Sequence, residues 1–268
     1  MFKTRLLSGI VLVIVLVATV GLGGNVLLAV LGIISLIGMS ELYKVVGVHN
    51  KVLGLAGYLA AAVYYALLFT GRMEYVMMLS ILFLVAVMAV YVFSFPKFQA
   101  EQVMTVFFGL YYVAVMLSYV YQTRLLSDGG TVVWLIFLSS WGCDTCAYCV
   151  GVLIGKHKMA PKLSPKKSVE GGIGGVLGAA LLGVLFALLM SRWQGVAAHP
   201  SQYAVICGVG GMISQVGDLA ASAVKRNHDI KDYGKLIPGH GGILDRFDSV
   251  IFTAPVIYYL ALLLAGNI

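Results

Sequence analysis

The feature that most constrains this chain is a series of nine long apolar segments separated by short polar connections. A helix that crosses the ~30 Å hydrocarbon core of a bilayer needs roughly 20 predominantly apolar residues. Only 11% of the residues are charged, whereas a soluble domain carries about 25%, so too few polar residues are present to cover a water-facing surface. The predicted spans are 6–21, 26–45, 52–70, 75–93, 103–121, 132–154, 173–190, 203–224 and 249–265.

These spans predict an all-α polytopic integral membrane protein with about nine transmembrane helices. A transmembrane β-barrel would show alternating segments of about ten residues, and these long Leu, Val, Ala and Gly runs do not alternate. Basic residues are enriched in cytoplasmic loops, and all but three of the 18 lie on the N-terminal side of the predicted membrane. We therefore expect the N-terminus and the large polar loops in the cytoplasm, at the inner membrane, and the C-terminus outside.

The two halves of the chain differ in character. Residues 1–125 are nearly featureless apolar helices, and we interpret them as a scaffold in which Glu41 and Glu101 lie on solvated faces near helix ends. Residues 126–268 contain two acids inside apolar spans and two basic loops. We therefore expect the catalytic site in the C-terminal half.

Asp144 is the first of the two acids inside predicted spans. A carboxylate within a bilayer costs several kcal/mol unless it is paired, solvated or bound to a cation. Ser140 and Tyr148 stand four residues before and after it, which predicts that the three side chains share one helix face. Asp144 is then either a functional carboxylate or a protonated acid that only holds helices together.

Asp218 is the second acid, and it belongs to a polar stripe. Ser214, Asp218 and Ser222 recur every four residues and lead to Lys225 and Arg226. Such a stripe must face a partner helix or a wet cavity. Because carboxylate and hydroxyl oxygens suit Mg²⁺, the two acids predict a cation site open to the cytoplasm, with helix–helix hydrogen bonding as the structural alternative.

The loop after the sixth span combines lysines with a glycine-rich helix start, KKSVEGGIGG at 166–175. Free backbone N–H groups at the start of a helix bind phosphates, so the segment predicts a phosphate site. Glycines four residues apart, such as Gly174 and Gly178, also allow close packing of membrane helices. The lysines could alternatively serve only as an anchor at the membrane surface.

Segment 222–248 holds the densest group of charges in the chain, between two apolar spans. Its basic side chains can neutralise a polyphosphate, and its acids can hold cations or orient the bases. The Pro-Gly-His-Gly-Gly sequence at 238–242 predicts a tight turn that permits close approach to a ligand. Asp248 with Ser249 could instead cap the last helix. The bases are Lys225, Arg226, Lys231, Lys235 and Arg246, and the acids are Asp229, Asp232, Asp245 and Asp248.

In these segments the chain resembles the phosphatidate cytidylyltransferases, or CDP-diacylglycerol synthases. The resemblance lies in SAVKR (222–226), KDYG (231–234) and IPGHGGILDRFD (237–248), with neighbouring blocks DTCAYCVG (144–151) and SPKKSVEG (164–171). Ser168 stands where threonine is common in that family, which keeps the hydroxyl. In the first half of the chain the resemblance is limited to hydropathy.

The resemblance implies transfer of CMP from CTP to phosphatidic acid, giving CDP-diacylglycerol and pyrophosphate in phospholipid biosynthesis. The lipid phosphate is already an anionic nucleophile, so catalysis should consist mostly of positioning and charge stabilisation. Mg²⁺ is the expected cofactor, and a second cation is allowed. The implied catalytic residues are Asp218, Lys225, Arg226, Asp245 and Asp248, and the implied metal ligands are Asp144, Asp218, Asp245 and Asp248. The implied substrate-binding residues are Lys166, Lys167, Ser168, Glu170, Lys231, His240, Gly241, Gly242 and Arg246.

Two other functions stay open on the residues alone. A CTP-dependent lipid kinase would use the same nucleotide but transfer its γ-phosphate, and a cation-coupled transporter would use Asp144 and Asp218 as ion sites. The expected partners are CTP, phosphatidic acid and membrane lipids, with a homodimer allowed and no nucleic acid.

Overall fold

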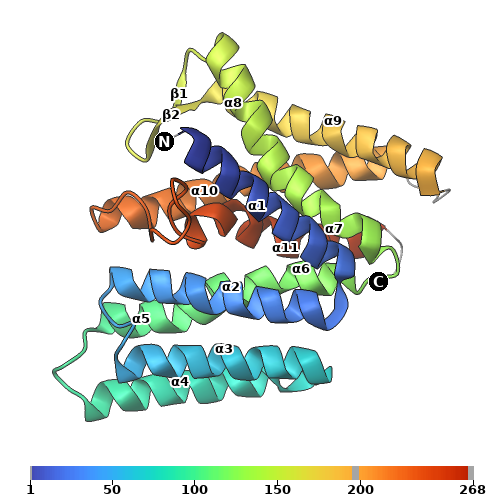
Figure 1. Ribbon diagram of the computed structural model, residues 1–268. Coiled ribbons are helices and arrows are strands. Elements are labelled where there is room, and N and C mark those ends of the chain that lie inside the picture. Colours follow the sequence, from blue (N-terminus) through green and yellow to red (C-terminus); the bar gives the residue numbers. More distant parts are fainter. Residues whose placement is uncertain (1, 195–198, 265–268) are drawn as a thin grey trace. The chain divides into compact units, whose positions relative to one another are not determined.

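The computed structural model describes residues 2–194 and 199–264, most of which are helical (Figure 1). Eight helices within this part of the chain are long and apolar enough to cross a membrane. The predicted class, an all-α polytopic integral membrane protein, is therefore confirmed. The first predicted span corresponds to α1 (Phe2–Leu22).

The remaining elements follow in chain order. The helices before the polar hairpin are α2 (Gly24–Val45), α3 (Val52–Thr70), η1 (Met73–Tyr75), α4 (Val76–Phe93), α5 (Ala100–Gly109), η2 (Leu110–Val115), α6 (Met116–Arg124), α7 (Gly129–Phe137), η3 (Leu138–Gly142) and α8 (Cys143–Ile154). The antiparallel strands β1 (Lys158–Ala160) and β2 (Ser164–Ser168) form the hairpin. The last helices are α9 (Val169–Gln194), α10 (Pro200–Asn227) and α11 (Leu244–Leu264).

Helix boundaries agree with the predicted spans except around the charged segment. α10 continues through Lys225 and Arg226, where basic side chains interact favourably with the helix C-terminus. α11 begins at Leu244, so Asp248 lies inside the helix. The interpretation of Asp248 as a helix cap is therefore wrong, and the loop between the two helices is limited to residues 228–243.

A π-helical segment, η3, separates α7 from α8 and changes the helical register next to Asp144. A π-turn closes i→i+5 bonds and so rotates the following residues relative to an α-helix. Ser140 is fully buried and its hydroxyl donates to the carbonyl of Ile136 at 2.9 Å, whereas Tyr148 is 73% exposed. The prediction that Ser140 shares one face with Asp144 is therefore wrong, whereas Asp144 and Tyr148 lie four residues apart within α8 and so share a face as predicted.

The chain forms two compact units. The N-terminal unit contains the described residues up to 121 together with 232–246, and the C-terminal unit contains 122–231 and the residues from 247 onward. The expected division into a scaffold, 1–125, and a catalytic half, 126–268, stays a prediction. However, most of the charged loop belongs structurally with the N-terminal helices.

In the N-terminal unit, close helix packing depends on small residues around Tyr43. α3 lies beside α4 and α2 packs against α3 and α5 (Figure 1). A Cβ atom at either Gly57 or Gly109 would collide with the Tyr43 ring, whose hydroxyl donates to the carbonyl of Val106 at 2.9 Å. Tyr43 is fully buried, so this cluster fixes the position of the α2 end that carries Glu41.

In the C-terminal unit, α9 packs against α8 and α10 through its glycines. A Cβ at Gly174 would meet the Val150 side chain at 2.5 Å, and one at Gly178 would meet Cys146 at the same distance. The predicted role of these glycines in close helix packing is therefore confirmed. This packing holds α8, which carries Asp144, beside the start of α9.

Candidate active site

The C-terminal unit contains an ion pair between a loop lysine and a helix acid. Side chains alternate along a strand, and in β2 Lys167 is half-buried and turns toward α10 while Lys166 is exposed. The Nζ atom of Lys167 pairs with Oδ2 of Asp218, and both side chains are about three-quarters buried, with 26% and 27% exposed. Two residues predicted for the site from different parts of the sequence are thereby in contact.

Asp248 joins this group from α11. Its side chain is buried, with 7% of the residue exposed, and it interacts electrostatically with Asp218, Lys225 and Asp144. Gly217 makes the approach of α10 to α11 possible, because a Cβ there would lie 2.9 Å from the Asp248 carbonyl oxygen. Three carboxylates and two lysines therefore form one charged group, which we call the acidic cluster: Asp144, Asp218, Asp248, Lys167 and Lys225.

The acidic cluster meets the requirements of a divalent cation only in part. Within the part of the chain that the structure describes, no three His, Cys, Asp or Glu side chains lie close enough together to hold a metal ion. Mg²⁺, however, is usually bound through one or two carboxylates together with waters and substrate phosphates. The three carboxylates of the acidic cluster interact electrostatically and outnumber its two lysines, so the cluster fits such a partial site.

Ser214, one turn before Asp218, is also buried within this region. Its hydroxyl is without a hydrogen-bond partner among the described residues. A buried hydroxyl left in this state is unfavourable. The observation is consistent with the predicted polar stripe facing a ligand or water, although Ser214 itself was not among the predicted site residues.

Ser168 and Glu170 both stabilise the start of α9. The Ser168 hydroxyl accepts a hydrogen bond from the Gly171 N–H at 3.1 Å, as an N-cap does. The Glu170 carboxylate accepts from the backbone N–H groups of Lys156 and His157 and pairs with the His157 ring. These contacts shape the hairpin that presents Lys167, and the substrate-binding role predicted for both residues stays a prediction.

In the N-terminal unit, Asp245 organises the charged loop. Its Oδ2 atom accepts hydrogen bonds from the Tyr233 N–H at 2.8 Å and the Gly242 N–H at 3.0 Å. The Asp245 residue is 6% exposed. Asp245 thus folds the loop back on the first turn of α11, and its predicted role as a metal ligand stays a prediction.

Sequence reasoning missed the importance of Glu41, which had been expected on a solvated face. It is buried, with 3% exposed. Its two carboxylate oxygens accept hydrogen bonds from the Ile243 N–H at 3.1 Å and the Leu244 N–H at 2.8 Å, at the start of α11. A carboxylate is favourable there because helix N-terminal N–H groups need acceptors. The one sequence signal for this role was the position of Glu41 near a helix end. Its hydrogen-bond partners could not be predicted, because they lie 202 and 203 residues away in the sequence.

His240 is held by a residue of α1. The Ser8 hydroxyl donates to the Pro238 carbonyl at 3.1 Å and lies 2.9 Å from Nδ1 of His240. These two contacts hold the His240 ring against α1. The preceding and following glycines, Gly239 and Gly241, have φ angles of 79° and 85°, which side chains rarely adopt.

The other predicted substrate-binding residues differ in their exposure. Arg226 and Lys231 are exposed, whereas Arg246 and Gly241 are half-buried and Gly242 is buried. The structure therefore brings together Asp144, Asp218, Asp248, Lys167 and Lys225 in one unit. It groups His240, Gly241, Gly242, Asp245 and Arg246 in the other.

The sequence as a whole was compared with known protein families, and one match covers nearly all of it. The profile of the cytidylyltransferase family matches residues 3–264, and the chain belongs to this family. It is 32% identical over 263 residues to the phosphatidate cytidylyltransferase of Staphylococcus epidermidis, covering 96% of this chain and 98% of that protein. The Staphylococcus aureus protein of the same name is 31% identical with the same coverage. That of Bacillus subtilis is 33% identical over 61% of this chain and 60% of its own length.

Proposed function

We propose that this protein is a phosphatidate cytidylyltransferase, which transfers CMP from CTP to phosphatidic acid and releases pyrophosphate. The family match over residues 3–264 and the names of relatives that align over almost the whole chain support this activity. The observation that carries the proposal is the pairing of Lys167 with Asp218 beside Asp248. Neither the lipid kinase nor the cation-coupled transporter is supported by the comparisons.

The chemistry needs few protein groups. A phosphate oxygen of phosphatidic acid attacks the α-phosphorus of CTP, and the bond from that phosphorus to the β-phosphate bridging oxygen breaks. Pyrophosphate leaves with the electron pair. Lys167 and Lys225 stabilise the charge that builds on phosphate oxygens. Because the nucleophile is already anionic, no Ser or Cys attack is required.

Asp144, Asp218 and Asp248 would hold Mg²⁺ in this proposal, with substrate phosphates completing its coordination. The bound ion would neutralise phosphate charge, as it does in phosphoryl transfer generally. With substrate and cation present, Lys167 would exchange its contact with Asp218 for a phosphate oxygen. This exchange keeps the lysine near the reacting atoms and frees one carboxylate.

The loop residues of the N-terminal unit would receive the nucleotide. His240 presents its imidazole at a tight turn, where the positive φ angles of Gly239 and Gly241 allow close approach of a ligand. Arg246 in this unit, and Lys166, Arg226 and Lys231 in the C-terminal unit, would bind phosphate oxygens. The excess of basic residues near these segments supports an active site on the cytoplasmic side of the inner membrane, with membrane lipids and a second copy of the chain among the proposed partners.

The test is a product analysis with the purified protein in detergent, phosphatidic acid, Mg²⁺ and CTP labelled separately in the α- and γ-phosphates. We expect α-label in the lipid and γ-label in pyrophosphate. Asp218→Asn should abolish the transfer while the protein stays folded. Asp128→Asn is the matched control, because Asp128 is exposed and makes no capping hydrogen bond, and it should keep wild-type activity.

The other outcomes each identify a different protein. Transfer of γ-label to the lipid would make it a kinase. Absence of both labels from the lipid, with no binding of CTP, would return the transporter to consideration. If Asp218→Asn and Asp128→Asn lost activity equally, the assignment of the acidic cluster as the site would be contradicted. The proposed reaction of the wild-type protein would still stand.

A further inference from the structure

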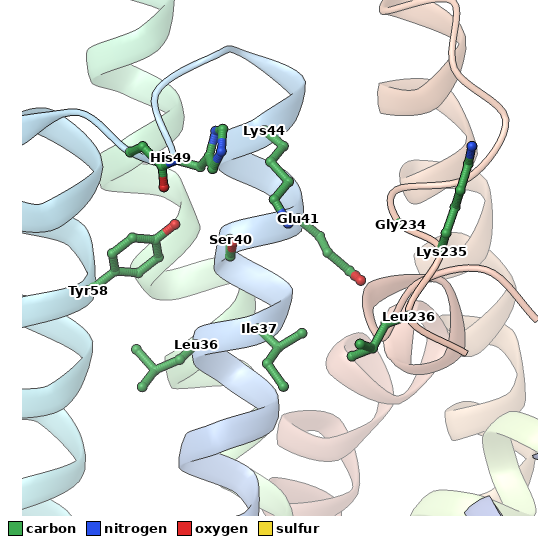
Figure 2. A pocket seen from close by; sticks show the side chains of 11 residues that line it. Leu36, Ile37, Ser40, Glu41, Lys44, His49, Tyr58, Gly234, Lys235 and Leu236 are labelled. Atoms are coloured by element: carbon green, nitrogen blue, oxygen red, sulfur yellow. The ribbon is translucent and has the colours of Figure 1, made fainter. Parts of the chain in front are cut away.

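The N-terminal unit contains an open pocket of about 600 Å³ that the proposed reaction does not use. Its walls come from the last turns of α2, the turn between α2 and α3, the first turns of α3 and residues 234–236 of the charged loop. Figure 2 shows the Glu41 side chain reaching from α2 toward the loop segment that carries Leu236.

The lining of this pocket changes from apolar to basic along the α2 axis. Leu36 and Ile37 line its apolar end, Ser40 follows, and Lys44 lies in the last turn with His49 just beyond. With a rise of 1.5 Å per residue, Leu36 and Lys44 are about 12 Å apart along the axis. In a membrane protein, this order matches an amphiphile with its acyl chains beside Leu36 and its headgroup beside Lys44.

The charges in the pocket define the headgroup. Lys44 and Lys235 contribute two positive charges, and Glu41 contributes one negative charge. The Glu41 carboxylate is already engaged by the backbone N–H groups of Ile243 and Leu244. The pocket therefore has one net positive charge, which complements a singly charged phosphodiester better than a doubly charged phosphomonoester.

We propose that this pocket binds a singly charged phosphodiester phospholipid, of the phosphatidylglycerol class, as an accessory ligand. Its phosphate would contact Lys44 and Lys235, and its acyl chains would lie along Leu36 and Ile37. The lipid would contact loop residues 234–236, and Gly234 among them lies against the Glu41 carboxylate, which also accepts hydrogen bonds from the start of α11. An occupied pocket therefore steadies the charged loop, and the lipid raises the activity of the enzyme without being its substrate.

The test measures lipid binding directly, by native mass spectrometry of the full-length protein in detergent with phosphatidylglycerol or phosphatidylcholine. We expect retention of one phosphatidylglycerol. Lys44→Gln should lower the retained fraction about five-fold, since one basic group near a membrane surface contributes about this much. Leu36→Trp should lower it similarly by filling the apolar end, without any change in charge.

Matched controls separate this site from general attraction. Lys97→Gln removes a lysine that lies over the Phe98 ring outside the pocket, and Ile33→Trp enlarges an exposed α2 side chain that does not line it. Both should bind phosphatidylglycerol like the wild type. With phosphatidylcholine replaced by phosphatidylglycerol in mixed micelles, cytidylyl transfer should rise in the wild type and not in Lys44→Gln, whose basal rate should be unchanged.

Several results would overturn the proposal. Equal losses in Lys44→Gln and Lys97→Gln would indicate diffuse charge attraction. Displacement of the lipid by soluble glycerol phosphate would indicate a phosphate site with no lipid component. Retention of phosphatidic acid alone, with a raised KM for it in Lys44→Gln, would make the pocket a substrate site. Binding of phosphatidylglycerol without detectable cytidylyl transfer would refute the proposed function while leaving the pocket assignment standing.

Discussion

The buried carboxylates of the two units have different interaction partners. In the N-terminal unit, Glu41 and Asp245 each accept two backbone hydrogen bonds, so their charge is used to fix the charged loop. In the C-terminal unit, the Asp218 and Asp248 carboxylates repel each other electrostatically. Lys167 and Lys225 offset this repulsion only in part. The first arrangement resembles a structural support, and the second resembles a site that is completed by a ligand.

This difference can be tested because the two kinds of acid should respond oppositely to neutral substitution. Removal of a structural acceptor leaves buried N–H groups without partners, which lowers stability. Removal of one carboxylate from a group of like charges relieves repulsion but destroys the site. Residues arranged for function are often costly to stability.

The largest effect is expected for Asp248→Asn. The substitution keeps the shape of the side chain but removes a charge from the acidic cluster, so kcat should fall roughly 10²- to 10³-fold, as for the loss of one electrostatic contact to a transition state. The unfolding temperature should stay equal or rise, because a like charge beside Asp218 and Asp144 is gone. A clear loss of stability would show that Asp248 is structural, and would end the contrast between the units.

Glu41→Ala should show the opposite pattern. The Ile243 and Leu244 N–H groups at the start of α11 lose their acceptors, which should cost about 1–3 kcal/mol of unfolding free energy. Denaturant unfolding in detergent measures the change. Glu101→Ala is the control, because Glu101 is exposed in the first turn of α5 and its loss should change the unfolding free energy by less than about 0.5 kcal/mol.

The sequence predicted the fold class and most of the acidic cluster because both are expressed locally. Apolar length marks each span, and an acid within such a span is conspicuous, as at Asp144 and Asp218. Contacts such as that of Ser8 with His240 could not be predicted, since they join residues more than 200 positions apart and involve side chains with ordinary local surroundings. The π-helix at η3 was missed for a related reason, because its extra residue leaves no mark on hydropathy.

Gly242→Ala should sharpen the role assigned to Glu41. A Cβ atom at position 242 would lie 2.5 Å from both Glu41 carboxylate oxygens, so the loop or the glutamate must shift, with an expected loss of about 1–3 kcal/mol. In the Glu41→Ala background, the same substitution should cost much less, because its obstacle is absent. A double-mutant cycle in denaturant measures this coupling, and additive losses would contradict the contact. Gly21→Ala is the control, since its Cβ would have nothing within 4 Å.

The smallest expected effect is that of Ser8→Ala. This substitution distinguishes whether α1 orients His240 for the nucleotide or only stabilises the charged loop. The loss of one hydrogen bond to Pro238 and one to His240 should reduce stability by about 1 kcal/mol or less. If His240 receives the nucleotide, its imidazole should become free to rotate, and the KM for CTP should rise several-fold with kcat nearly unchanged. Initial rates at varied CTP measure both constants. Thr19→Ala, which removes a hydroxyl bonded only within α1, should leave both at wild-type values. A several-fold fall in kcat with no change in the KM for CTP would mean that α1 stabilises the loop but does not orient His240 for the nucleotide.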